Sequence, residues 1–186
     1  MNQFSDKVWW TKKARIKTER RLLKFDFYSQ LLLIWYSFFL VAYSIFSLVN
    51  PANGNNESAV MISLSVLVLV MTLFINSMNL KGRAMLIKQC YEQLSVIYTR
   101  AKIETDIIEL DKEYQKVLSI SENHNEYDFS CALIDEYNNT EDKSKLSKQP
   151  TKSQIKTRRN IKIINYLILI SSFIFPVFVV FFLRMI

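Results

Sequence analysis

Residues 28–49 read YSQLLLIWYSFFLVAYSIFSLV and contain no Asp, Glu, Lys, Arg or His. The stretches 58–77 and 163–183 share this property. About 20 residues of α-helix, at about 1.5 Å each, cross a hydrocarbon core of about 30 Å. The remaining polar residues are too few to cover three fully apolar helices in a soluble fold. The sequence therefore predicts an integral membrane protein with three transmembrane helices.

The scarcity of turn residues predicts an all-α fold. The 186 residues include only 2 Gly and 3 Pro, whereas sheet proteins need turns every few residues. We expect an antiparallel transmembrane hairpin with long cytoplasmic helical extensions, followed by a third transmembrane helix. In chain order, its parts are a helix at 5–27, a span at 28–49, an outer turn at 50–57, a span at 58–79, a helical region at 80–137, a linker at 138–162 and a span at 163–183.

Lys and Arg near the membrane ends predict the orientation. Eight of them precede residue 28, whereas the connector NPANGNNE at 50–57 has none. Basic residues concentrate on the cytoplasmic side of membrane proteins, so the N-terminus is expected inside and the C-terminus outside. The net charge of +7 then forms a collar attracting anionic lipid. Direct nucleic-acid binding is disfavoured because no nucleic-acid motif accompanies the charge.

The region after the second span carries an apolar stripe. Its residues, at three- and four-residue steps, predict a helix that contacts a partner or the N-terminal helix: Ile87, Tyr91, Leu94 and Tyr98. Extended to about Ile120, this helix would be roughly 60 Å long. The acidic residues at 104–113 would then lie beyond most of the basic collar, with little charge pairing. Residues 138–162 have the composition of a loose, hydrophilic tether.

No catalytic or metal site is predicted. The single histidine, His124, cannot form a multi-histidine site within one chain. Cys90 and Cys131 lack CxxC spacing and are expected to be reduced. No Gly-rich loop is present to bind phosphate, so no cofactor is expected.

Polar residues within the spans follow a seven-residue spacing, which places them along one side of each helix. In hydrocarbon such groups face either another helix or water. Because no ionisable group lies within a span, any permeation path would be lined by hydroxyls and amides, and it would require a homo-oligomer. The pore-lining candidates are Ser37, Ser44, Ser65, Thr72 and Asn76.

The order of motifs resembles the SLATT domain, a two-span effector module of bacterial nucleotide-linked conflict systems. The resemblance covers about residues 7–137 and rests on WWTKKARIKTERR at 9–21, KGRAMLIKQCYEQLSVIY at 81–98 and SENHNEYDF at 121–129. Span 163–183 is similar to members encoded beside reverse transcriptases. Within the most specific stretch, the following residues are expected to have a gating or structural role, with helix capping as the simpler alternative: Glu122, Asn123, His124 and Asp128.

The resemblance implies a pore-forming effector of anti-phage defence in the bacterial inner membrane. Its trigger would come from a separate sensor or nucleotide-synthesising protein, such as a reverse transcriptase or nucleotidyltransferase, and would lead to abortive infection. Two alternatives stay open. One is a non-conducting scaffold that tethers a soluble defence enzyme, and the other, disfavoured by the missing site, is a small membrane-bound enzyme.

Overall fold

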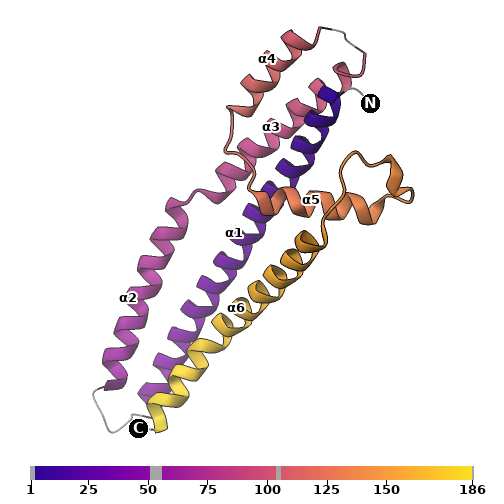
Figure 1. Ribbon diagram of the computed structural model, residues 1–186. Coiled ribbons are helices and arrows are strands. Elements are labelled where there is room, and N and C mark those ends of the chain that lie inside the picture. The colour runs from indigo at the N-terminus through magenta and orange to yellow at the C-terminus, as the bar shows by residue number, and fades with distance from the viewer. Residues whose placement is uncertain (1–2, 51–55, 104–105, 186) are drawn as a thin grey trace. The chain divides into compact units, whose positions relative to one another are not determined.

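The computed structural model describes residues 3–50, 56–103 and 106–185, and these form helices joined by turns, with no strand, which confirms the all-α prediction. The described residues form six α-helices and one short 3-10 helix, and Figure 1 labels the α-helices. Their bounds are α1 Gln3–Val49, α2 Asn56–Ser77, α3 Leu80–Arg100, α4 Ile107–Leu118, α5 Glu126–Asn139, η1 Lys143–Lys145 and α6 Lys152–Met185. Most of the predicted outer turn lies outside the described residues.

The chain divides into two compact units. The extramembrane unit comprises Met1–Lys24 and Leu80–Lys162, and the membrane unit comprises Phe25–Asn79 and Ile163–Ile186. Helices α1, α2 and α6 each contain an apolar window long enough to cross a bilayer, with mean hydropathy of 2.0, 2.6 and 2.4. Their large side chains stay exposed to the surroundings. The protein is therefore an integral membrane protein.

Helix α1 is continuous over 47 residues, as the absence of Gly and Pro from its interior predicts. The second span behaves differently from expectation, because the helix does not run on unbroken from the span into the region after it. Met78 and Asn79 interrupt it between α2 and α3, and Asn79 has φ of 44°. This left-handed backbone is disfavoured for most residues but is tolerated by Asn.

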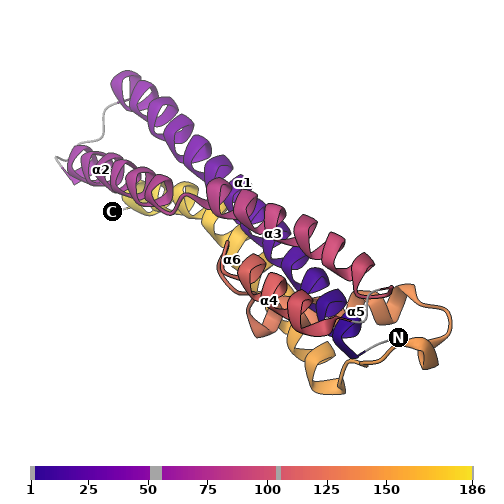
Figure 2. The same cartoon turned by 90° about the horizontal axis from the view of Figure 1, so that it is seen from above.

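The prediction that this helix continues as far as Ile120 is also wrong. The chain turns after Ala101, and Figures 1 and 2 show α4 running back beside α3. Asp106 begins α4 as its N-cap, because its side chain accepts a hydrogen bond from the Glu109 amide. Turning back shortens the reach of this region and brings acidic residues of α4 beside basic residues, contrary to expectation.

Two ion pairs show this correction directly. Lys7 lies 3.2 Å from Asp111, and Arg100 lies 2.5 Å from Glu113. Glu104, the first residue of the predicted acidic group, lies outside the described residues.

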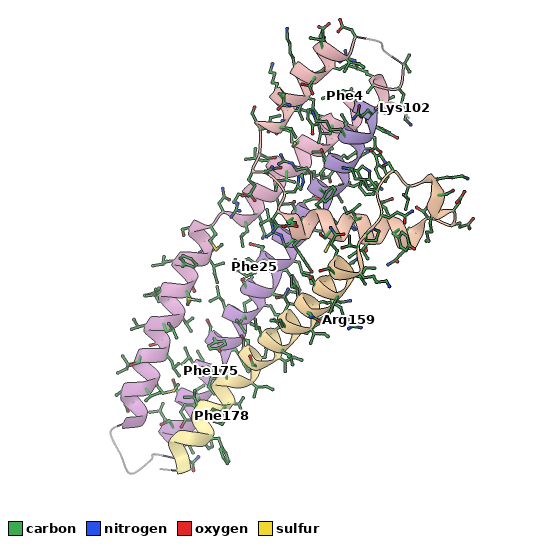
Figure 3. All side chains as sticks on the ribbon, viewed as in Figure 1. Phe4, Phe25, Lys102, Arg159, Phe175 and Phe178 are labelled. Carbon is green, nitrogen blue, oxygen red and sulfur yellow. The ribbon has the colours of Figure 1, made fainter. Side chains whose placement is uncertain are left out.

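A hydrophobic core joins α1, α3 and α4 within the extramembrane unit. Fully buried side chains on all three helices pack together, with Tyr98 and Ile120 at the edge. The buried members are Phe4, Val8, Cys90, Leu94, Ile97, Ala101, Leu110, Tyr114 and Val117. Figure 3 labels Phe4 at the α1 end of this core. Removing these apolar surfaces from water is what stabilises the unit.

The segment predicted as a loose linker is folded. Trp10 donates a hydrogen bond to the Ser147 hydroxyl at 2.8 Å, and that hydroxyl donates to Asp6 at 2.6 Å. Helix α6 then begins at Lys152, eleven residues before the predicted span. Polar side chains therefore hold this segment against α1. Such contacts cannot be found by searching the sequence for apolar residues.

Candidate functional site

Residues 121–128 comprise part of the turn after α4 and the first residues of α5, and they bind three arginines from two other helices. The Arg15 guanidinium donates to the Ser121 hydroxyl at 2.8 Å and to the Glu122 carbonyl. Arg83 of α3 donates to the Glu122 carboxylate at 2.5 Å. Arg15 is only 1% exposed, so its charge is stabilised mainly by polar groups of this turn. We name residues 121–128, with the side chains that hold them, the connector site.

Asp128 is the best-enclosed carboxylate of the connector site. It is 1% exposed, and Arg21 binds it in a bidentate manner at 2.9 and 3.0 Å. The buried Thr18 hydroxyl donates a third hydrogen bond at 3.0 Å. The carboxylate is buried whereas the Arg21 side chain is 42% exposed, so these hydrogen bonds are what stabilise the buried charge of Asp128. Asp128 therefore fixes α5 to α1.

His124 lies in the connector site with its ring stacked on Phe129 at 6.0 Å between centroids. Its Nδ1 is buried and has no hydrogen-bond partner among the described residues. Burial, reinforced by the nearby Arg15 charge, lowers the pKa of His124, and Asp128 only partly opposes this effect. His124 is therefore neutral at physiological pH, and protonation would place a second cation beside Arg15.

Capping in the connector site is performed by Asn125. Its side chain accepts a hydrogen bond from the Asp128 amide at 2.7 Å and starts α5. Asn123 accepts from the His124 amide at 3.0 Å. Of the four residues predicted here, Glu122 thus contacts α1 and α3, Asp128 contacts α1, and His124 stacks within the site on α5. Asn125 was missed, although Asn followed by acidic residues in the first turn is a helix-start signal.

The polar residues of the spans remain on the helix surface. Ser37, Ser44, Ser65 and Asn76 are exposed, and Thr72 is half-buried. The hydroxyls of Ser44, Ser65 and Thr72 each donate a hydrogen bond of 2.7–2.8 Å to a backbone carbonyl of their own helix. Each oxygen keeps its acceptor capacity, so these stripes are available to water or to another helix.

The apolar stripe of α3 is turned inward. Ile87 and Leu94 are fully buried within the extramembrane unit, so the prediction that they contact a separate partner is not supported there. Tyr91 bonds to Glu19 of α1, and Lys12 donates to Ser95 at 2.7 Å. The stripe therefore packs on α1, as in the predicted alternative of contact with the N-terminal helix. Tyr98 and Tyr91 are half-buried, and a role in partner contact remains a prediction for them.

Within the residues that the structure describes, no group of three or more His, Cys, Asp or Glu side chains could hold a metal ion. An open groove of about 580 Å³ lies beside the start of α1, between Phe4, Trp10 and Phe129. The Lys7 ammonium at its rim pairs with Asp111, and Trp10 bonds to Ser147. These polar groups are engaged with one another, so we assign no cofactor to the groove.

A family model matches residues 1–183, and its description is SMODS and SLOG-associating 2TM effector domain family 5, abbreviated SLATT. The chain belongs to the SLATT family. Searches of curated proteins and of solved structures found no match. The SLATT match extends past residue 137 and includes the third apolar helix. SLATT membership implies a membrane effector role in defence systems, and an effector of this kind is suggestive of a non-enzymatic protein.

The membrane unit of this SLATT chain holds an interaction that the sequence pattern did not indicate. Pro176 lies inside α6 and is buried. A proline has no amide hydrogen, so the carbonyl four residues earlier, that of Ser172, loses its helical partner. The Tyr36 hydroxyl of α1 donates to that carbonyl at 3.0 Å, and Trp35 donates to the next one, of Phe173, at 3.0 Å. The third helix is thus bound to the first.

An aromatic ladder on α1 adds to this contact. Trp35, Phe39, Tyr43 and Phe46 follow one another at four-, four- and three-residue steps, with ring centroids 6.2–6.4 Å apart. Trp35 also lies 6.2 Å from the ring of Phe173. The spacing was visible in the sequence, whereas the partner on α6 was not. The SLATT chain therefore has a first and third helix joined by aromatic and polar contacts.

Proposed function

We propose that the chain is a membrane effector whose copies associate through α2 and form a pore. The observation that carries this proposal concerns α2, the most apolar of the three candidate spans. Its apolar window contains no buried residue, whereas those of α1 and α6 do. α2 nevertheless carries Ser65, Thr72 and Asn76 along one side. Polar groups at membrane depth normally face protein or water.

One copy cannot supply a water-filled path from this side of α2, because a channel must be enclosed by polar surfaces. A closed ring of copies would enclose a water-filled path. Ser37 and Ser44 of α1 would add a second row of polar side chains to its lining. Each hydroxyl on α2 that bonds to its own helix keeps lone pairs for water. Packing between helices uses the same residue types, so the experiment must separate association from conduction.

The trigger is assigned to the extramembrane unit, which we place in the cytoplasm of a bacterium because basic residues flank the spans on that side. A separate sensor or nucleotide-synthesising protein, such as a reverse transcriptase or nucleotidyltransferase, would act there. Opening of the inner membrane would then stop growth before phage multiply. The family description of a SMODS- and SLOG-associating effector supports a role as the responding component.

Cysteine cross-linking tests the association. Ser65→Cys is compared with Leu67→Cys, which lies about 200° further around α2 and is also exposed. Both are made with Cys131→Ser, and Cys90 is buried. A bismaleimide added to membranes should join copies at residue 65 much faster than at residue 67. Equal rates at the two positions, or no dimer at either, would refute the α2 interface.

Conduction is tested separately. Cells producing the protein with its trigger should lose membrane potential, as reported by a potential-sensitive dye. Ser65→Leu, Thr72→Val and Asn76→Leu together should retain cross-linking at a reporter cysteine yet reduce the loss of potential. Growth arrest with intact potential would contradict pore formation.

Exposed apolar side chains favour a second candidate, the non-conducting scaffold. In the extramembrane unit Met85 is 71% exposed, Val96 58% and Ile108 74%. Such residues are typical of protein contact surfaces when they cluster. A scaffold predicts that Met85→Ser and Val96→Ser abolish defence while the α2 substitutions leave it intact. The pore predicts that the α2 substitutions abolish it.

A further inference from the structure

The basic residues of the extramembrane unit differ in whether they pair with carboxylates. Three on α1 pair with carboxylates of α5: Lys13 with Glu136 at 2.6 Å, Lys17 with Asp135, and Arg21 with Asp128. On α6, Arg158 pairs with Asp135 at 2.6 Å. Its neighbours Lys152, Lys156 and Arg159 are exposed, and the described residues contain no ion pair with any of them. We name these three residues the α6 cationic face. Figure 3 labels Arg159 on this helix.

Helical geometry places the α6 cationic face in one sector. At about 100° per residue, Lys156 and Arg159 lie within about 40° of Lys152 around the axis. Arg158 lies about 120° away, on the side that contacts α5. The positively charged sector is therefore turned away from Asp135, the α5 carboxylate that pairs with Arg158.

The same sector continues into the apolar part of α6. Ile163, Ile170 and Val177 lie within about 20° of Lys152 around the helix, and each is more than half exposed. Because α6 is one helix from Lys152 to Met185, its lipid-facing side carries on directly as the cationic face. Along the axis, Arg159 precedes Ile163 by about 6 Å, Lys156 by about 10 Å and Lys152 by about 16 Å.

These positions match the layer of lipid headgroups at the edge of the hydrocarbon core, which long basic side chains reach by extending toward the polar surface. Ile155 lies about 60° from Lys152, at the edge of this sector, and is 45% exposed, which adds an apolar contact. We propose that the α6 cationic face binds the headgroups of anionic phospholipids. A surface interleaved with isoleucine and continuous with a lipid-facing helix fits a membrane better than a free polyanion. The proposal is independent of pore formation.

Native mass spectrometry of the full-length protein in detergent, with added phosphatidylglycerol or phosphatidylcholine, tests this inference. The variant is Lys152→Gln, Lys156→Gln and Arg159→Gln combined. The matched control is Lys88→Gln, Lys112→Gln and Lys116→Gln, which removes three exposed charges from α3 and α4. Wild type and control should prefer phosphatidylglycerol. The α6 variant should lose at least about ten-fold in that preference, given about five-fold per cation near the surface.

Three outcomes would overturn the proposal. These are an unchanged preference in the α6 variant, an equal loss in the control, and stronger binding of a short single-stranded oligonucleotide than of phosphatidylglycerol to the same face at equal ionic strength. Circular dichroism and gel filtration show whether each variant remains folded. A milder variant, Arg159→Gln alone, gives a partial loss if the triple variant does not fold.

Discussion

The Tyr36 hydroxyl donates a hydrogen bond to the Ser172 carbonyl at 3.0 Å. That carbonyl lacks its usual backbone partner, because the residue four positions later is Pro176. A side chain of the first span thus replaces an amide missing from the third. In a bilayer, where water cannot reach such a carbonyl, the replacement satisfies a group that would otherwise be costly.

Tyr36→Phe should destabilise the membrane unit by about 1 kcal/mol, because the Ser172 carbonyl loses its donor. Pro176→Ala restores the amide, so the cost of Tyr36→Phe should fall below about 0.5 kcal/mol in that background. Thermal unfolding in detergent, followed by tryptophan fluorescence, measures all four forms. An equal cost with and without Pro176 would show that the two groups are not coupled.

Asp128→Ala should loosen α5 from α1, since it leaves Arg21 unpaired and the Thr18 hydroxyl without its acceptor. The Arg21 side chain left behind is 42% exposed and can be hydrated, so the expected cost is about 1–3 kcal/mol. Hydrogen exchange of the α5 amides should therefore accelerate strongly. Glu92→Gln breaks an exposed pair with Lys88 at 4.0 Å and serves as the control, with a change below about 1 kcal/mol. Similar protection in Asp128→Ala and wild type would contradict this account of the connector site.

His124 should make the extramembrane unit sensitive to mild acid. Its pKa is lower in the folded protein than the ordinary value of about 6.5, because burial and Arg15 disfavour the charged form. The unfolded chain therefore binds the proton more readily, and stability is lost as pH falls from about 6.5 through the folded pKa. His124→Gln should flatten the unfolding temperature across this range, while wild type declines.

Asp135 provides an internal comparison at lower pH. Burial opposes its ionisation, but hydrogen bonds from Lys17 and Arg158 outweigh that effect and lower its pKa. Its contribution is present above the ordinary carboxylate pKa of about 4 and is lost below it. Asp135→Asn should therefore change the profile only at the acid end. A decline near pH 6 that persists in His124→Gln would assign the mild-acid effect to another group.

Asn79 should tolerate glycine better than alanine. Its φ of 44° is accessible to Gly without strain, whereas a Cβ without a local hydrogen bond makes this conformation costly. Both substitutions remove the amide side chain, so their difference reports the backbone alone. Asn79→Ala should be less stable than Asn79→Gly by about 1 kcal/mol in thermal unfolding. Equal stabilities would mean that the left-handed conformation does not persist.

The apolar runs were sufficient to predict three membrane helices and an all-α fold, because hydrocarbon thickness sets a length that few other structures need. The start of α6 was missed even though its signal is local. Thr151 and Gln154 bond to each other's amides at 2.9 and 3.2 Å, which is a capping box readable from T-x-x-Q. The hydrophilic composition of the segment concealed it.

The turn between α3 and α4 was missed for a different reason. No Gly or Pro marks it, and the apolar periodicity resumes beyond it, so the pattern resembles one interrupted helix. The N-cap signal at Asp106 and Glu109 was the available clue. By contrast, Trp10 with Ser147 and Arg15 with Glu122 are contacts between residues more than 100 positions apart. Only the folded chain brings such pairs together, so spacing could not predict them.

The hydrogen bonds from Trp35 and Tyr36 to α6 affect how a truncated form of the protein should be interpreted. A chain cut after the second span would leave an indole and a phenol without acceptors in hydrocarbon, and it would uncover the aromatic ladder. Loss of activity on such a cut would report damage to the first helix as readily as a role for the third. Point substitutions in α6 that spare residues 172–176 are the safer means of assigning its contribution.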